Sequence, residues 1–294
     1  MRLLIFHNPD AGHEDLPRHR VLEQLQRARH EVVWVEKGSV ELGAALAEPF
    51  DAVVVAGGDG SVASVGRELA ARGIPIAILP SGTANNIASI VGATSENLLQ
   101  LLERGKTIPF DLGTLESSLA SRRFLEGIGL GAFAEAAAIL AAHTEGPFAP
   151  DGREAELARD RRVLGECVRS TPGYECRLVL DDAEVIGTWL LVEVTNAGVI
   201  GPNLRLSGDA VPYDGLLDVV TVDVAEREAL LAFVHAHQLQ VAAVPPLTVQ
   251  RARRVKLGVP AHRPFHVDGE TLESAEPIDL HIGVEPGALR FFAE

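Results

Sequence analysis

The stretch Asp51-Ala-Val-Val-Val-Ala-Gly-Gly-Asp-Gly-Ser61 decides the architecture of the first part of this chain. Its β-branched run, Val53 to Val55, is typical of a strand buried in a parallel sheet. The run stops at Gly57-Gly-Asp-Gly60, and apolar residues at helical spacing then indicate an amphipathic helix that starts at Ser61. A strand that leads through glycines into a helix N-terminus can bind phosphate, because glycine lets backbone N–H groups approach an anion closely.

A carboxylate inside this turn is unusual, because its negative charge repels phosphate. We therefore expect Asp59 to hold a metal ion or to accept a proton. Residues 76–86 repeat the pattern with an apolar strand, a turn of small residues and a second helix from Asn85. Ligands of open α/β sheets bind beyond the carboxyl ends of the strands, so the two turns favour one shared phosphate site. The alternative is that each is only a tight turn.

Length and composition indicate a folded protein with a large core. The 294 residues suit one large domain or, as the pattern along the chain favours, two. Hydrophobic residues make up 47% of the chain, but no apolar run is long enough to span a membrane. The first residues resemble a strand rather than a secretory signal, and Cys167 and Cys176 suggest reduced, buried thiols. We therefore expect a cytoplasmic protein.

The net charge excludes some partners. With 26 basic and 41 acidic residues, the formal net charge is −15, which argues against nucleic acid binding and against general attraction to anionic lipid. The basic stretch Arg251-Ala-Arg-Arg-Val-Lys256 is a local exception. It indicates either a contact with phosphate or lipid head groups or, as the favoured interpretation, an edge strand protected by charge.

Two patterns divide the chain. Over residues 1–115, short apolar strands alternate with helices, which predicts an α/β domain with a doubly wound parallel sheet. Over residues 116–294, short strands separated by Gly and Pro turns predict an antiparallel β-sandwich domain. Residues 124–131 are expected to form one strand, and residues 132–164 to be helical with a break at 146–150. Whether the last residues of the chain pack with the first domain is left open by the sequence.

Four further segments carry polar groups suited to chemistry, and each has a plainer alternative. They are Asn8-Pro-Asp-Ala-Gly12, Ser81-Gly-Thr-Ala-Asn85, Ala210-Val-Pro-Tyr-Asp-Gly-Leu-Leu-Asp218 and His266-Val-Asp-Gly-Glu270. The first two suit contacts to a nucleotide, but equally a turn and a helix cap. The third combines a carboxylate with turn carbonyls, as Mg²⁺ binding requires, or is an ordinary turn. The fourth places two carboxylates in a hairpin, where one can act as a general base, or is a surface hairpin.

Taken together and in this order, the motifs resemble those of the bacterial diacylglycerol kinases and related lipid kinases. The segments that carry the resemblance are Asn8-Pro…Gly12, Gly57-Gly-Asp-Gly-Ser61, Gly82-Thr-Ala-Asn85, Asp214-Gly-Leu-Leu-Asp218 and Val267-Asp-Gly-Glu270. This family includes the sphingosine kinases and is distantly related to the NAD kinases. The resemblance covers nearly the whole chain. It implies a nucleotide-binding first domain, a lipid-binding second domain, and an enzyme that uses ATP and Mg²⁺ to phosphorylate diacylglycerol to phosphatidic acid.

The resemblance also implies roles for individual residues. Glu270 takes the proton of the lipid hydroxyl with Asp268 beside it, and Asp59 contributes to catalysis or to the metal bound to the nucleotide. A structural Mg²⁺ is held by Asp214 and by the backbone carbonyls near Val211 and Leu216. The residues implied to contact ATP are Asn8, Pro9, Asp10, Ala11, Gly12, Gly57, Gly58, Asp59, Gly60, Ser61, Val62, Ala63 and Thr83.

Three positions depart from the family pattern. Ser64 and Asn86 stand where the pattern has acidic residues. The pattern also has a threonine after the second strand, and in this chain another residue near Trp34 replaces it. Two alternatives therefore stay open: a nucleotide-binding regulatory protein with little kinase activity, and an enzyme similar to NAD kinase that acts on a soluble hydroxyl. The expected partner is a lipid substrate at the membrane surface, which a cytoplasmic protein reaches by peripheral association with the inner face. A homodimer is compatible with the sequence.

Overall fold

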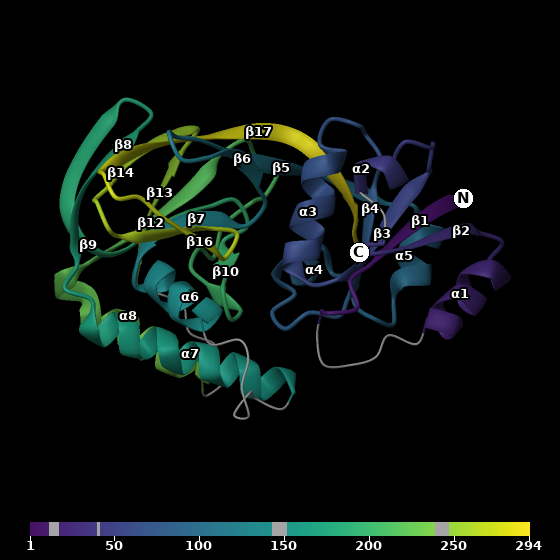
Figure 1. The fold of residues 1–294 in the computed structure, drawn as a ribbon, viewed down its shortest axis with the longest axis horizontal. Coiled ribbons are helices and arrows are strands. Elements are labelled where there is room, and N and C mark those ends of the chain that lie inside the picture. The colour runs from purple at the N-terminus through teal and green to yellow at the C-terminus, as the bar shows by residue number, and fades with distance from the viewer. Residues whose placement is uncertain (12–17, 40–41, 143–151, 239–246) are drawn as a thin grey trace. The chain divides into compact units, whose positions relative to one another are not determined.

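The chain forms two compact units in the computed structural model (Figure 1), which describes residues 1–11, 18–39, 42–142, 152–238 and 247–294. Unit 1 consists of Met1–Phe110 and Gly287–Glu294, and unit 2 consists of Asp111–Pro286. Sequence analysis predicts a boundary after residue 115 and leaves the position of the last residues open. The predicted parallel sheet of the first domain and the antiparallel sandwich of the second are both confirmed.

A parallel sheet forms the centre of unit 1. Val53, Val54 and Val55 are completely buried in it, as their β-branched run predicts. The strands follow the order β2-β1-β3-β4, with the bounds Glu31–Glu36, Arg2–His7, Ala52–Gly57 and Ile76–Pro80. Because β1 lies between β2 and β3, the winding of the chain reverses there, and open α/β sheets bind ligands at such a switch point.

Helices follow the strands of unit 1. The helix after β3 begins at Asp59 rather than at the predicted Ser61, because the Gly58 carbonyl already accepts hydrogen bonds from the N–H groups of Ser61 and Val62. Asp59 is therefore the first residue of the helix and not part of the glycine turn before it. The helices α1 to α5 span Arg18–Arg27, Leu42–Ala45, Asp59–Leu69, Asn86–Val91 and Leu98–Arg104.

The strands β5 (Thr107–Glu116) and β17 (Ile278–Phe292) each begin in one unit and end in the other. In unit 1, Phe291 of β17 pairs with Ile76 of β4 in a parallel arrangement. Its ring packs edge to face on Phe110, with ring centroids 5.1 Å apart. The last residues of the chain therefore continue the sheet that the first residues begin.

Unit 2 is built on antiparallel strands. Sequence analysis predicts one strand over residues 124–131, and this prediction is wrong. The backbone turns after Phe124, because the N–H groups of Leu125 and Glu126 bond to the carboxylate of Asp268 instead of a neighbouring strand. The strands are β6 (Ser121–Phe124), β7 (Gly127–Gly131), β8 (Tyr174–Leu180), β9 (Ala183–Thr195), β12 (Leu217–Asp223), β13 (Thr248–Ala252), β14 (Arg254–Val259), β15 (Pro264–Val267) and β16 (Glu270–Glu273), with β10 (Val199–Ile200) and β11 (Leu204–Arg205) as a separate pair.

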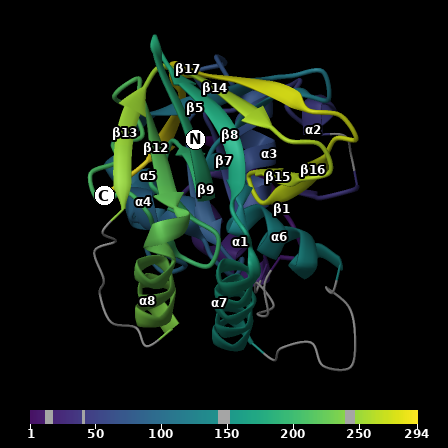
Figure 2. The ribbon, with the colours of Figure 1, turned by 90° about the vertical axis from the view of Figure 1, so that its left-hand side faces the viewer.

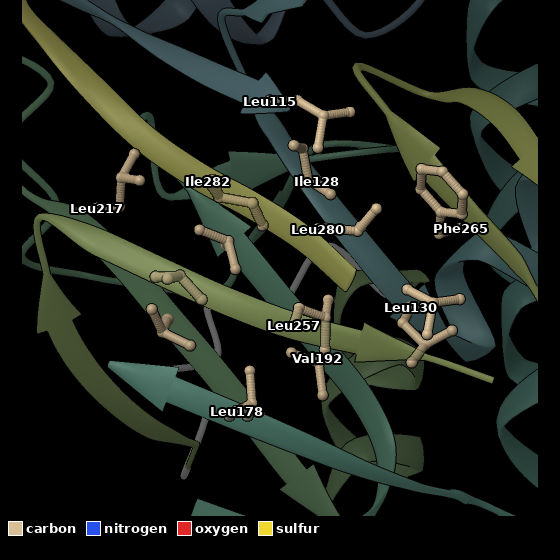
Figure 3. Packing of buried hydrophobic residues seen from close by; sticks show 14 of the residues in the cluster. Leu115, Ile128, Leu130, Leu178, Val192, Leu217, Leu257, Phe265, Leu280 and Ile282 are labelled. Atoms are coloured by element: carbon tan, nitrogen blue, oxygen red, sulfur yellow. The ribbon is translucent and has the colours of Figure 1, made fainter. Parts of the chain in front are cut away.

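Apolar residues cover both faces of this sheet. Ile128, Val192 and Phe265 belong to the core of the sandwich, which Figure 3 shows from close by. Leu191 and Val220 belong to a second core, which is shared with the helices α6 (Ala132–Ala142), α7 (Arg153–Ser170) and α8 (Arg227–Gln238). The helices α7 and α8 lie side by side (Figure 2). Successive residues of one strand thus enter different cores, as the alternation of a β-strand requires.

Three smaller predictions concern features outside the site. Cys167 and Cys176 are buried and form no disulfide, and burial raises their pKa to about 11 and about 12, so both remain thiols at neutral pH. The helix break predicted at residues 146–150 lies outside the described residues. Over the part of the chain that the structure describes, no helix is both long and apolar enough to cross a membrane.

Candidate functional site

A cavity of about 460 Å³ lies in unit 1 at the carboxyl ends of β1 and β3. This is the switch point of the sheet, where the architecture offers a ligand site. The residues expected to contact ATP that line it are Asn8, Asp10, Ala11, Gly58, Gly60, Ser61 and Thr83. The remaining expected residues do not line the cavity, namely Pro9, Gly57, Asp59, Val62 and Ala63, or lie outside the described residues, namely Gly12.

Phe6 and Lys37 also line the cavity, and sequence reasoning missed both. Lys37 directly follows β2, and its backbone N–H donates to the His7 carbonyl at 2.8 Å. Its Nζ lies 4.0 Å from Oδ2 of Asp10, so the cavity contains a cation that can bind phosphate. The order of the strands could have revealed Lys37. This lysine follows β2, the parallel neighbour of β1, and therefore lies at the same edge of the sheet as the turn after β1.

The turns that follow β3 and β4 meet through their glycines. A Cβ atom on Gly82 would lie 2.4 Å from Cα of Gly58, which is too close for any residue other than glycine. The turn after β1 is tied to the same wall, because Nδ2 of Asn8 donates to Oγ of Ser61 at 3.0 Å. The wall of the cavity therefore consists of turns that contact one another directly.

Asp59 joins the two helices that follow the turns after β3 and β4 through its side chain. Its carboxylate oxygens accept hydrogen bonds from the N–H groups of Asn86 and Ile87, each at 3.0 Å, at the start of α4. Burial raises the pKa of Asp59, although its backbone hydrogen bonds act to lower it. The carboxylate thus caps α4, a role that sequence analysis does not include. Its part in catalysis or in binding the nucleotide's metal stays a prediction.

Replacing Asp59 by asparagine is expected to lower the free energy of unfolding by roughly 0.5–2 kcal/mol, because the single amide oxygen cannot accept both hydrogen bonds of the cap. Urea unfolding measures the change. Asp10→Asn is the matched control, since it makes the same change at an aspartate of unit 1 that is 81% exposed. Native stability of the Asp59 variant would contradict the capping role, and a loss of turnover alone would assign Asp59 to the chemistry.

The candidate carboxylates of unit 2 lie in the hairpin between β15 and β16. Asp268 and Gly269 have φ angles of 49° and 78°, and two successive left-handed residues are typical of a type I′ turn. The Asp268 carboxylate accepts hydrogen bonds from the N–H groups of Leu125, Glu126 and Gly127, with shortest distances of 3.1, 2.8 and 3.3 Å. Asp268 therefore fixes the hairpin to the backbone between β6 and β7.

Glu270, the first residue of β16, pairs with an arginine. Its Oε2 lies 2.7 Å from Nη1 of Arg122, and the Glu270 side chain is 67% exposed. Nε and Nη2 of Arg122 are buried and have no hydrogen-bond partner among the described residues. The Arg122 side chain is only 23% exposed, so Glu270 is the more accessible partner of the pair.

The turn proposed to hold Mg²⁺ is organised by a buried aspartate that sequence analysis does not single out. Oδ2 of Asp111 accepts a hydrogen bond from the Gly215 N–H at 2.7 Å. Oδ1 of Asp214 accepts one from the Leu216 N–H at 2.9 Å, which leaves Oδ2 of Asp214 for a cation. Within the described ranges, no group of three or more His, Cys, Asp or Glu side chains is arranged to hold a metal ion. A metal here would take its other ligands from carbonyls, such as that of Val211, and from water.

Two family models match separate parts of the chain. Residues 2–115 match the model of the diacylglycerol kinase catalytic domain. Residues 164–293 match the model of the YegS C-terminal NAD kinase beta sandwich-like domain. The chain therefore matches a diacylglycerol kinase catalytic domain followed by the β-sandwich-like domain of YegS.

Similarity to complete proteins defines the family. The chain is 31% identical over 309 residues to a protein of Pseudomonas aeruginosa (strain UCBPP-PA14) named "Probable lipid kinase YegS-like", an alignment that covers 98% of this chain and 92% of that protein. The protein belongs to the family of diacylglycerol kinases and YegS-like lipid kinases. It is 27% identical over 299 residues to the diacylglycerol kinase of Mycobacterium tuberculosis (strain ATCC 25618 / H37Rv), covering 96% and 92% of the two chains. A crystal structure of a diacylglycerol kinase from Bacillus anthracis has the same fold, with a TM-score of 0.71 and 17% identity over 100% of this chain and 97% of that chain.

Proposed function

We propose that the protein is an ATP-dependent lipid kinase that transfers the γ-phosphoryl group of ATP to the hydroxyl of diacylglycerol and forms phosphatidic acid. The observation that carries this proposal is the cavity at the switch point between β1 and β3. Its lining includes Gly58 and Gly60, and glycines at the start of a helix let backbone N–H groups approach an anion closely. Lys37 adds a positive charge, so the lining suits the phosphates of a nucleotide. Family membership supports a lipid acceptor.

In the proposed reaction, the acceptor oxygen bonds to the γ-phosphorus while the bond from that phosphorus to the β–γ bridging oxygen breaks, and ADP leaves. The proton of the acceptor hydroxyl passes to a carboxylate, for which Glu270 is the candidate. Phosphoryl transfer depends mainly on positioning and on stabilisation of charge, which the turns and Lys37 would supply. Asp59 joins the start of α3 to the start of α4, and Asp268 fixes the hairpin that carries Glu270.

The ion pair with Arg122 is compatible with Glu270 acting as a base. An ion pair with an exposed partner contributes about 0.2–1 kcal/mol, so opening it slows a reaction by at most about 5-fold. A positioned general base accelerates a reaction by about 10²–10⁴-fold. The gain from the base therefore exceeds the cost of opening the pair.

Mg²⁺ is the metal proposed for this protein, and when bound with ATP it neutralises charge on the phosphates. The separate turn with Asp214 offers only oxygen ligands: one carboxylate and the carbonyls near Val211 and Leu216. This donor set fits Mg²⁺, which binds through one or two carboxylates and keeps several waters. The proposed role of this second ion is structural, because its ligands belong to a turn that Asp111 already fixes.

Mg²⁺ is expected to stabilise the protein without nucleotide, because an ion that binds only the folded state shifts the unfolding equilibrium. At a concentration roughly 100-fold above its Kd, the gain in free energy of unfolding is about 2.7 kcal/mol. Calorimetry with Mg²⁺ and with a chelator measures this effect. Asp214→Asn should remove it, whereas Asp182→Asn, at a 99% exposed position, should not. If Mg²⁺ stabilised Asp214→Asn as much as the wild type, Asp214 would not be a ligand of the stabilising ion.

Incubation with γ-labelled ATP, Mg²⁺ and diacylglycerol in mixed micelles tests the proposed function. We expect labelled phosphatidic acid, and no labelled lipid when triacylglycerol replaces diacylglycerol, because triacylglycerol has no hydroxyl group. Label on a different lipid would still support a lipid kinase but would show that diacylglycerol is not its acceptor. Formation of NADP from NAD and ATP would instead support an enzyme similar to NAD kinase.

A nucleotide-binding protein with little kinase activity is the second candidate, and Ser64 is the observation that favours it. Ser64 lines the cavity at a position where the family pattern has an acidic residue. Without that acid, fewer negative groups attract the metal bound to the nucleotide. Saturable ATP binding in calorimetry, with no transfer to any lipid of a broad panel, would favour this candidate over the kinase.

A further inference from the structure

A buried histidine–carboxylate pair lies in unit 2 beside the hairpin that carries Glu270. His266 of β15, Gly129 of β7 and Glu193 of β9 are direct cross-strand neighbours in one row of the sheet. Nε2 of His266 lies 2.9 Å and 3.1 Å from the two carboxylate oxygens of Glu193. Glu193 is 0% exposed and His266 is 6% exposed, so neither side chain is accessible to a substrate.

The glycine between them makes room for the pair. A Cβ atom on Gly129 would lie 1.9 Å from Oε1 of Glu193, so the carboxylate occupies the space that any other side chain would fill. The flanking Ile128 and Leu130 face the core of the sandwich. Gly129 therefore faces the opposite side of the sheet, on which α6 packs.

Stability alone does not account for this pair. The free energy needed to remove a charged group from water often exceeds what one hydrogen-bonded contact gives back. A protein with apolar residues of similar volume in place of such a pair is often equally stable. His266 is the one hydrogen-bond partner of the Glu193 side chain among the described residues. The arrangement therefore calls for a role beyond filling the interior.

The second ring nitrogen of His266 reaches the hairpin. With the ring neutral and its proton on Nε2, Nε2 donates to Glu193 and Nδ1 accepts a hydrogen bond from the Gly269 N–H at 3.4 Å. Burial lowers the pKa of His266, but the charge and hydrogen bond of Glu193 and the charge of Asp268 outweigh it and raise the pKa. The ring thus connects the interior of the sheet to the turn before Glu270.

We propose that His266 is a positioning residue: Glu193 fixes its ring through Nε2, and its Nδ1 fixes the Gly269 turn that places Glu270. Asp268 holds the same turn from the side of β6, so the hairpin is fixed at two points. The kinetic part of this inference rests on the proposed function, in which Glu270 accepts the proton. The structural part concerns only how firmly the backbone of the hairpin is held.

Two substitutions separate the two bonds of the ring. In H266Q, the amide nitrogen can take the place of Nε2 and keep the bond to Glu193, but the acceptor for Gly269 is lost. In H266N, the amide oxygen can take the place of Nδ1 and keep the bond to Gly269, but Glu193 is left unpaired in the interior. Glu184→Gln is the matched control, because Glu184 belongs to the same strand β9, is 46% exposed and pairs with Arg177.

For H266Q, we expect hydrogen exchange at the Gly269 amide to become about 10-fold faster, because its hydrogen bond is lost. The kcat for diacylglycerol should fall by about 10–100-fold with an unchanged KM for ATP, since a small displacement of a catalytic group is sufficient for such a loss. For H266N, we expect slow exchange at Gly269 and a lower melting temperature. Glu184→Gln should behave like the wild-type protein in every measurement.

Wild-type exchange and wild-type kcat in H266Q would overturn the positioning role and leave the pair as interior packing. If H266Q does not fold, E193L/H266F removes both bonds without an unpaired charge, and unchanged exchange at Gly269 in that variant would overturn the proposal equally. Faster exchange in a protein whose wild type phosphorylates no lipid would contradict the proposed function but keep the positioning role, because exchange is measured without substrate.

Discussion

Replacing Glu270 by glutamine is expected to lower the kcat for diacylglycerol phosphorylation by about 10²–10⁴-fold, because glutamine keeps the size of the side chain but cannot accept the proton. The KM for ATP should change little, since the residues that line the cavity belong to unit 1 and Glu270 belongs to unit 2. Steady-state kinetics in mixed micelles, with ATP and lipid varied separately, measure both quantities. Full activity of the variant would remove Glu270 from the mechanism.

Two control variants identify the cause of any loss. Glu273→Gln makes the same change at the other end of β16, where the side chain is 57% exposed, and should retain wild-type kinetics. Arg122→Met removes the partner of Glu270 but keeps the carboxylate, and should change kcat by at most about 5-fold. An Arg122 variant as inactive as Glu270→Gln would mean that the ion pair, rather than proton transfer, is what the reaction needs.

Gly82→Ala is expected to disrupt the candidate nucleotide site. The added Cβ atom would lie 2.4 Å from Cα of Gly58, and backbone atoms cannot rotate away as the end of a side chain can. Separating the two turns should lower the free energy of unfolding by about 1–3 kcal/mol. Because the same turns line the cavity, ATP affinity should fall by roughly 10-fold or more, which corresponds to about 1.4 kcal/mol per tenfold.

Gly60→Ala is the matched control for this second prediction. Gly60 belongs to the same glycine-rich segment, but a Cβ atom there would meet no other atom within 4 Å. Its stability in urea unfolding should equal or slightly exceed that of the wild type, because alanine favours a helix over glycine. Calorimetric titration with ATP compares the two variants. Native stability and native ATP affinity of Gly82→Ala would show that the contact between the turns is not needed.

The sequence predicts those parts of the fold and site whose cause is local. The β-branched run before Gly57 forms a buried parallel strand because its own residues are apolar throughout, and the motifs place Asn8, Ser61 and Thr83 in one cavity because each follows the carboxyl end of a strand. The Asp-Gly turn of the hairpin also follows from local chemistry, since Gly269 readily adopts the left-handed conformation that the turn requires.

What the sequence does not reveal is which distant groups a polar side chain contacts. Asp268 bonds to backbone N–H groups 141–143 residues away, and Asp59 bonds to groups 27 and 28 residues away. Spacing along the chain cannot predict such contacts, because they exist only after the strands have paired. For the same reason, the split of residues 124–131 into β6 and β7 follows from a side chain of another hairpin and not from the segment itself.

The strand β17 has a consequence for the order in which the protein is made. Phe291 supplies the neighbour of Ile76 in the sheet of unit 1, yet every residue of unit 2 is synthesised before it. While unit 2 emerges from the ribosome, β4 therefore lacks this partner, and an unpaired strand edge is a site where nascent chains aggregate. The sheet of unit 1 therefore cannot be completed until Phe291 has been synthesised, after all of unit 2.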